Sequence, residues 1–188
     1  MCGDLEPIMN GKRTQLNTLA LKAAAALASL LTLTLCTTAQ AYYSGGTGEP
    51  NDPFKISTPA DWQELMTTEA HWGKHFLLTN DLDLEGISLT PVGYNPNSFV
   101  GVFDGNGHVI RNIDISLPEG RLVGLFGLMK TPGEIKNLTV RDVVVVGSDT
   151  VGGLVGTNLR GTISNCCSTG HVAGDVGEPE FGARSGDA

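Results

Sequence analysis

The sequence contains few cysteines and few basic residues. Among its 188 residues are four cysteines and 12 lysines and arginines, against 20 aspartates and glutamates, which gives a formal net charge of −8. Nucleic acids and anionic membrane surfaces attract basic proteins, so we do not expect an acidic chain of this kind to bind either. The charge balance therefore argues against two large classes of partner.

Two of the four cysteines, Cys166 and Cys167, are adjacent. Adjacent cysteines do not make the disulfide framework that holds small secreted folds together. Because neighbouring residues of a strand face opposite sides, we expect Cys166 to face the core and Cys167 the solvent. A strained disulfide between the two is the alternative interpretation.

Motifs of common enzyme active sites are also missing. The sequence has no GxSxG elbow, no phosphate-binding loop and no dinucleotide fingerprint, although it contains 25 glycines. The glycines follow a long repeat instead of marking a junction between a strand and a helix. We therefore expect no enzyme activity, no cofactor, and no catalytic, cofactor-binding or metal-binding residues.

The N-terminal residues have the pattern of a signal peptide. Lys12 and Arg13 precede an apolar stretch at residues 19–35, which is followed by the small-residue sequence Ala39-Gln40-Ala41. This order predicts a signal peptide over residues 1–41 and a secreted or cell-surface protein.

Two other uses of the apolar stretch compete with cleavage by signal peptidase. A membrane span needs about 20 unbroken apolar residues, and Lys22 interrupts this stretch, so we expect no membrane span in the mature chain. The residues Leu33 to Cys36 have the outline of a lipoprotein site, which makes a lipid anchor the other alternative.

A repeat extends from Phe99 to Val172, and internal repeats of this size indicate stacked structural units. Each unit has a glycine-bracketed apolar pair and, several residues later, an Ile-x-Asn segment. The pairs lie at Gly101–Gly105, Gly124–Gly127 and Gly153–Gly156. The second segments lie at Ile110–Ile113, Ile135–Leu138 and Ile163–Cys166. The asparagines of these segments are 25 and 28 residues apart, a suitable length for one coil of a β-solenoid.

Apolar residues alternate with polar ones inside each unit, as in Ile113-Asp114-Ile115, which predicts short strands with one buried face. We therefore expect an all-β fold, a short right-handed solenoid resembling a parallel β-helix. In this fold Ile110, Ile135 and Ile163 should form one stacked column. Asn112, Asn137 and Asn165 either bond from coil to coil as a ladder or each close their own turn.

At these residues the sequence resembles the GLUG motif family, named for glycine, leucine, any residue and glycine. The resemblance covers residues 99–174, and Tyr43 to Ile56 is similar to the segment found ahead of such repeats in large bacterial surface proteins. Members of the family include adhesin-like chains and non-catalytic regions of IgA-cleaving metallopeptidases. The resemblance therefore implies a bacterial repeat module at the cell surface, with no catalytic residue of its own.

Residues 42–98 should form an N-terminal cap region. Thr58-Pro59-Ala60-Asp61 is typical of a helix start, so we expect a helix at about residues 59–69. One face of this helix carries Trp62, Leu65 and Met66, which should cover the open first coil.

A first strand is expected at residues 76–84, with Leu78, Leu82 and Leu84 in the core. The repeat ends before residues 175–188, which should form a flexible tail without a cap. We interpret the chain as a truncated or frame-disrupted relative of longer repeat proteins.

Three sets of polar residues are candidates for chemistry. His71 and His75 have the four-residue spacing of a zinc-binding helix, but Trp72 replaces the required glutamate and Gly73 weakens a helix, so a surface turn is favoured. Asp104 and His108 flank the turn sequence Asn106-Gly107, and no second carboxylate is placed for sugar hydrolysis, so a turn is favoured here as well.

The third set is Asp81, Asp83 and Glu85, whose carboxylates should lie on one face of a strand. Oxygen ligands of this kind suit calcium, yet Val92 stands where a helix-loop-helix site needs its last glutamate. An ordinary solvated strand face is the favoured interpretation, with calcium binding as the alternative.

These observations favour a secreted or surface-associated module without catalysis, acting in adhesion or in binding an extracellular glycan or protein. A second hypothesis is an accessory or truncated part of a larger secreted enzyme, either a peptidase or a polysaccharide-degrading one. A gene remnant without a role is the third.

Overall fold

The structure is a computed structural model, and it describes residues 43–174. The signal peptide expected at residues 1–41 and the tail expected at residues 175–188 lie outside the described residues. The described residues all belong to one structural unit.

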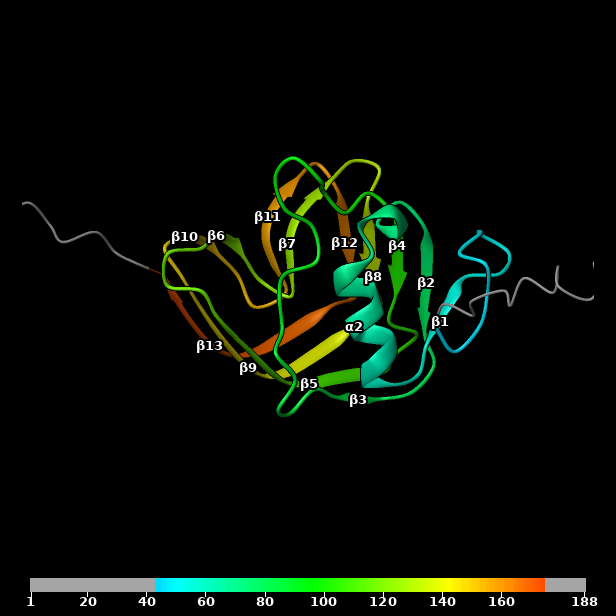
Figure 1. Ribbon diagram of the computed structural model, residues 1–188, viewed down its shortest axis with the longest axis horizontal. Coiled ribbons are helices and arrows are strands. Elements are labelled where there is room, and N and C mark those ends of the chain that lie inside the picture. Colours follow the sequence, from blue (N-terminus) through cyan, green and yellow to red (C-terminus); the bar gives the residue numbers. More distant parts are fainter. Residues whose placement is uncertain (1–42, 175–188) are drawn as a thin grey trace, which may run out of the picture. The chain divides into compact units, whose positions relative to one another are not determined.

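The fold is a β-solenoid, as expected from the repeat, and all pairings between its named strands are parallel. Figure 1 shows the strands of successive coils lying side by side. The largest sheet contains β1 (Phe54–Ile56), β2 (His75–Leu78), β4 (Val102–Asp104), β8 (Glu134–Lys136) and β12 (Thr162–Ser164) in this spatial order. The second contains β3 (Leu82–Asp83), β5 (Val109–Ser116), β9 (Thr139–Gly147) and β13 (Cys167–Gly174).

Two smaller sheets complete the coils. One pairs β6 (Arg121–Val123) with β10 (Asp149–Val151), and the other pairs β7 (Phe126–Lys130) with β11 (Val155–Leu159). Each strand lies opposite the matching strand of the neighbouring coil, so the backbone groups that point along the stack are satisfied between coils.

Inward-facing side chains form columns along the stack. In the largest sheet Phe76, Phe103, Ile135 and Ile163 occupy matching positions. The first three are at most 1% exposed. This repeated burial of apolar side chains is the main source of stability in such a fold, because a single coil cannot cover its own inner face.

The predicted column of three isoleucines is wrong in one member. Ile135 and Ile163 are register partners, but Ile110 lies in the second sheet between Leu82 and Val140. The error comes from similar segments at different places in the coil, because Ile110 and Asn112 lie within β5, whereas Ile135 lies in β8 and Asn137 in the corner after it. Ile110 pairs with Val140, 30 residues later, so the 25-residue spacing of the asparagines is not the length of one coil.

The first glycine-bracketed pair was also misplaced. Gly124–Gly127 and Gly153–Gly156 do match, because Val155 pairs with Phe126. Gly101 and Gly105 instead flank β4, which belongs to a different sheet. In the earlier coil, Val92 is the residue that pairs with Phe126. Glycine is needed at Gly127, where an added Cβ would lie 2.5 Å from carbonyl oxygens of Gly93 and Leu122.

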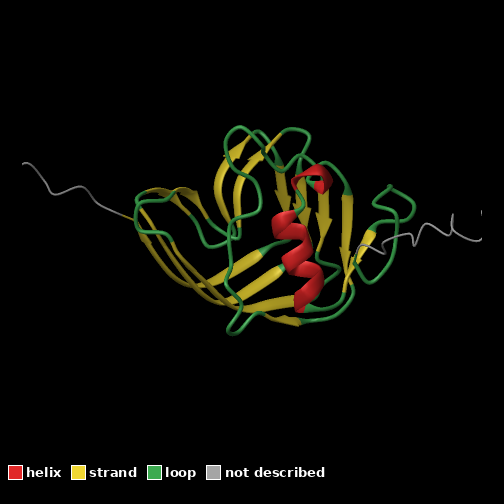
Figure 2. Cartoon of the chain, in the orientation of Figure 1, coloured by secondary structure: helices red, strands yellow, loops and turns green. Residues whose placement is uncertain are grey.

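The expected helix is present as α2 (Pro59–Thr67), followed by the 3-10 turn η1 (Glu69–His71), and Figure 2 shows it as the long helix beside the strands. Trp62 and Leu65 are fully buried. The Trp62 ring meets the rings of Phe103 and Phe126 edge-on, with centroids 5.7 and 6.0 Å apart. That this helix closes the first coil stays a prediction.

The strand expected at residues 76–84 is in fact two strands, β2 and β3, separated by a corner. The predicted core residues Leu78, Leu82 and Leu84 are nevertheless buried, at 0%, 2% and 1% exposure. Period-two alternation continued across the corner, so the pattern alone could not reveal the break.

Phe103→Ala should lower the free energy of unfolding by about 3–5 kcal/mol, because it empties the centre of a buried column. Ile163→Ala should have an effect of about 1 kcal/mol or less, because Ile163 is 41% exposed at the end of the same column. Urea denaturation of both variants measures the difference. Equal losses would contradict a column that is buried at its centre and open at its end.

Asp61 generates a prediction about pH. Burial of its carboxylate raises the pKa, but hydrogen bonds from Ser44, Ser57 and Thr58 outweigh that effect and hold the pKa below its ordinary value of 3.8. Because the folded-state pKa is lowered, the ionised Asp61 carboxylate adds to the free energy of unfolding above pH 3.8. This contribution is lost as the pH falls through the folded-state pKa.

Asp61→Asn should therefore destabilise the protein at neutral pH by about 1–3 kcal/mol. The difference from the unchanged protein should shrink as the pH drops below about 4. Denaturation curves across this pH range measure the difference in free energy of unfolding between the variant and the unchanged protein. Asp114→Asn, at an exposed site on β5, is the control. A difference that stays constant down to strongly acid pH would contradict the role of the Asp61 carboxylate.

Candidate functional site

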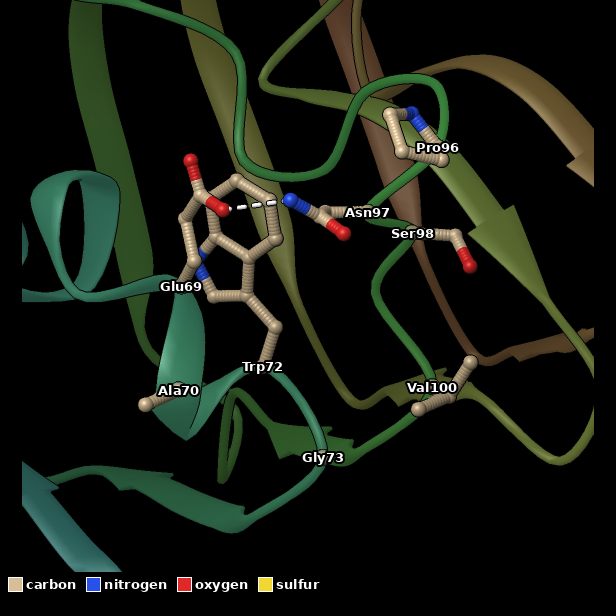
Figure 3. A pocket seen from close by; sticks show the side chains of 8 residues that line it. All are labelled: Glu69, Ala70, Trp72, Gly73, Pro96, Asn97, Ser98 and Val100. Atoms are coloured by element: carbon tan, nitrogen blue, oxygen red, sulfur yellow. Dashed lines mark hydrogen bonds between the residues drawn. The ribbon is translucent and has the colours of Figure 1, made fainter.

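One surface depression of the described residues lies between η1 and the loop after Gly93. It has a volume of about 450 Å³. Figure 3 shows Glu69, Ala70 and Trp72 on one side and Pro96, Asn97, Ser98 and Val100 on the other, with Gly73 between them. Carboxylate, amide and hydroxyl groups therefore surround an apolar floor, as in many binding sites for small molecules.

A second depression lies beside Tyr94, whose ring packs against Trp72 of the first depression. The second depression has a volume of about 460 Å³ and is lined by Tyr94, Asn95, Arg121 and Leu122. Tyr94 is 43% exposed, and its ring meets the ring of Trp72 nearly perpendicularly, with centroids 5.4 Å apart. A rigidly supported, exposed tyrosine offers both an apolar ring face and a hydroxyl group to a ligand.

The buried Trp72 holds the two segments together. Its indole Nε1 donates to the Leu65 carbonyl oxygen at 2.8 Å, and its own carbonyl oxygen accepts from the amides of Val100 and Gly101 at 3.0 and 2.8 Å. Across the depression, the Asn97 side-chain amide donates to the Glu69 carboxylate. The polar groups around the depression are thus fixed by bonds from both sides.

The loop itself is an insertion relative to the next coil. Val92 and Phe99 pair with Phe126 and Met129. Six residues (93–98) separate the first two, while two residues (127–128) separate the second two. The extra residues leave the coil and form the walls of both depressions.

Sequence analysis did not single out this loop. A signal was available in Tyr94-Asn95-Pro96-Asn97-Ser98, because a cluster of turn-forming residues with one aromatic side chain is typical of an exposed loop. The surrounding repeat concealed it, since residues 93–98 lie outside the repeated units.

His71 and His75 do not share a helix. His71 ends η1 and His75 begins β2, with a turn between them, as favoured from the sequence. His71 Nδ1 lies 3.0 Å from the Tyr43 hydroxyl, and burial lowers the pKa of His71. Within residues 43–174, no group of three or more His, Cys, Asp or Glu side chains is arranged to hold a metal ion.

Asp81 and Asp83 form hydrogen bonds with residues of the next coil. Asp81 accepts from the Val109 amide and lies 3.0 Å from His108 Nδ1, and these contacts lower its pKa. Asp83 accepts from the Asn112 side chain and from Arg111, and its pKa is lowered by bonds from Asn112, the Glu85 amide and Arg111. Both carboxylates bridge coils, which leaves fewer oxygen atoms for a calcium ion.

Asp104 and His108 have separate partners, so the structure does not bring them together. Asp104 Oδ1 accepts from the Asn106 amide at 2.8 Å and from the Asn137 side chain at 3.0 Å. His108 contacts Asp81 instead. Asn106 and Gly107 form the expected tight turn, both with positive φ.

The asparagine ladder exists for two of its three members. Asn165 Nδ2 donates to Asn137 Oδ1 at 2.9 Å, and Asn137 Nδ2 donates to Asp104 Oδ1. Asn112 lies within β5 instead and donates to Asp83. Asn137 and Asn165 have positive φ at the corners after β8 and β12, so these two asparagines both join the ladder and serve their own turns.

Cys166 and Cys167 are both free thiols. Cys166 packs against the core and is half-buried, and burial raises its pKa, whereas Cys167 is exposed. The opposite orientations expected for the pair are confirmed, and the alternative of a disulfide between them is not what the structure contains.

No family model matches the chain. It is 34% identical over 139 residues to halomucin of Haloquadratum walsbyi, covering 69% of this chain and 2% of that protein. It is 33% identical over 131 residues to a candidate Gly-rich membrane protein of Evansella cellulosilytica, covering 65% of this chain and 15% of the relative.

The chain thus spans only a small part of the length of these relatives. Among solved structures, a candidate immunoglobulin A1 protease from Bacteroides ovatus aligns with a TM-score of 0.44 and 16% identity, over 71% of this chain and 61% of that one. In the part of the chain that the structure describes, the helices are too short or too polar to cross a membrane.

Asn137 provides a test of the ladder. Asn137→Ala removes both side-chain bonds and places an alanine at a φ of 53°, so it should destabilise the protein by about 1–3 kcal/mol. Asn137→Gly also loses the bonds but tolerates this backbone conformation, so it should be the milder change. Thermal and urea denaturation compare the two. Two neutral variants would show that the ladder contributes no stability.

Proposed function

We propose that this chain is a non-catalytic β-solenoid module of the GLUG type, exported by an N-terminal signal peptide, which binds an extracellular glycan or protein at the cell surface. The observation that carries the proposal is the exposed Tyr94 ring, which lines one depression and packs against Trp72 of the other. The name halomucin and the description of the second relative as a Gly-rich membrane protein support a surface location.

The chemistry of the two depressions favours a glycan over a protein. Sugar rings present an apolar face that packs on an aromatic ring, and their hydroxyl groups bond with amides and carboxylates. Tyr94 supplies the ring, while Glu69, Asn95 and Asn97 supply the polar groups. Both depressions are open and shallow, which suits a chain of sugars running across the loop.

The net charge of −8 adds a constraint on the ligand. An acidic protein attracts anionic polymers poorly, so a neutral glycan is favoured. Arg121, at the edge of the second depression, is already paired with Asp149 through two bonds of 2.6 and 3.0 Å. This pairing leaves little positive charge for an acidic sugar.

Tyr94→Ala should weaken glycan binding by at least about tenfold, because it removes the central aromatic contact. Tyr94→Phe keeps the ring and should retain most of the affinity. A glycan array identifies the ligand, and titration calorimetry compares the variants.

Val144→Ala is the matched control, since Val144 is also 43% exposed but lies on β9. Binding that survives Tyr94→Ala would reject the site. If the glycan array gives no signal and a pull-down captures a protein partner, the ligand is a protein and the glycan proposal is wrong.

A further inference from the structure

The loop ahead of β1, residues 44–53, contains the only Asp-Pro bond in the sequence, between Asp52 and Pro53. Figure 1 shows this loop leading into β1. An Asp-Pro bond is chemically weak, because the aspartate carboxylate can attack its own backbone carbonyl carbon and close a five-membered ring. The proline nitrogen, which belongs to a tertiary amide without an N–H group, is then a better leaving group than an ordinary amide nitrogen.

The loop surrounds the carbonyl group of this bond with hydrogen-bond donors. The Asp52 carbonyl oxygen accepts from the backbone amides of Thr47 and Gly48 at 2.9 and 3.0 Å, and the Thr47 hydroxyl group donates to it at 3.4 Å. Negative charge develops on this oxygen when a nucleophile attacks the carbonyl carbon. Two backbone N–H groups directed at one oxygen stabilise such an oxyanion.

The side chain that would attack is available. Asp52 is exposed, and its carboxylate makes no hydrogen bond or ion pair with another described residue. The backbone around it is held in place, because the Asp52 amide donates to the Glu49 carbonyl oxygen at 3.0 Å. Gly46 has a φ of 84°, and a Cβ there would collide with the Pro53 carbonyl oxygen, so the loop is closely packed. The carbonyl group is thus fixed while the carboxylate can turn toward it.

We propose that the chain cuts itself once at the Asp52-Pro53 bond. A carboxylate oxygen of Asp52 bonds to the Asp52 carbonyl carbon, the bond from that carbon to the Pro53 nitrogen breaks, and the nitrogen takes a proton from water. The products are a cyclic anhydride at Asp52 and a new N-terminus at Pro53. A water molecule then opens the anhydride to two carboxyl groups, so the overall reaction consumes one water molecule.

Contacts across the bond hold the two pieces together after the cut. Tyr43 precedes the bond and is 9% exposed, and its ring centroid lies 4.5 Å from that of Phe54. The Ser44 amide donates to the Lys55 carbonyl oxygen, and the Lys55 amide donates to the Gly45 carbonyl oxygen. We therefore expect the cut protein to stay folded, so that only a denaturing method separates its pieces.

Mass spectrometry under denaturing conditions tests the proposal on the full-length protein, incubated at one fixed pH and sampled over time. We expect a fragment that begins at Pro53 and a partner that ends at Asp52. The chain unfolded in urea at the same pH should react at least about tenfold more slowly, because unfolding removes the two amide donors. Asp52→Asn, which removes the attacking carboxylate, should slow the cut by at least about tenfold as well.

Gly46→Ala separates the role of the loop from the ordinary weakness of an Asp-Pro bond, because it keeps both Asp52 and Pro53. It should slow the cut toward the rate of the unfolded chain, while circular dichroism shows that the solenoid is intact. Asp114→Asn, at an exposed aspartate on β5, is the matched control and should react as fast as the unchanged protein. The absence of a cut, equal rates in folded and unfolded chains, or a folded Gly46→Ala variant that reacts as fast as the unchanged protein would each overturn the proposal.

Discussion

The parallel register between successive coils is the constraint on which the structure depends. It places Phe76, Phe103, Ile135 and Ile163 in one column and so buries three of them almost completely. If one coil moved by a single residue, its inward side chains would turn outward and its neighbours would lose their cover. The coils therefore specify one another, whereas the corners between the strands can change in length.

This division explains how much of the fold the sequence could predict. The solenoid, the helix after Thr58 and the core positions Leu78, Leu82 and Leu84 follow from period-two alternation and from capping residues, which are local signals. The register between coils is not local. Ile110 was placed in the wrong column because one Ile-x-Asn segment lies within β5 and the others begin in the strands of the largest sheet, β8 and β12.

The candidate site could not be predicted in the same way, because it lies where the repeat is interrupted. Val92 and Phe99 keep the register of the later coil, and the loop between them is free to leave it. Burial of Trp72 fixes that loop and the neighbouring turn, and this contact joins segments more than 20 residues apart. Sequence spacing gave no indication that Tyr94 would rest on Trp72.

The two ends of the solenoid face the same physical problem, since each end exposes strand edges and the open side of a coil. At the first coil, the edge strands β1 and β3 are short and carry Lys55 and Asp83. In the last described coil the interior tapers instead, because Ser168 and Gly170 of β13 are the register partners of Val140 and Val143 of β9. Smaller side chains reduce the apolar area that this coil adds to the columns, so less burial is lost there than a full coil of valines would require.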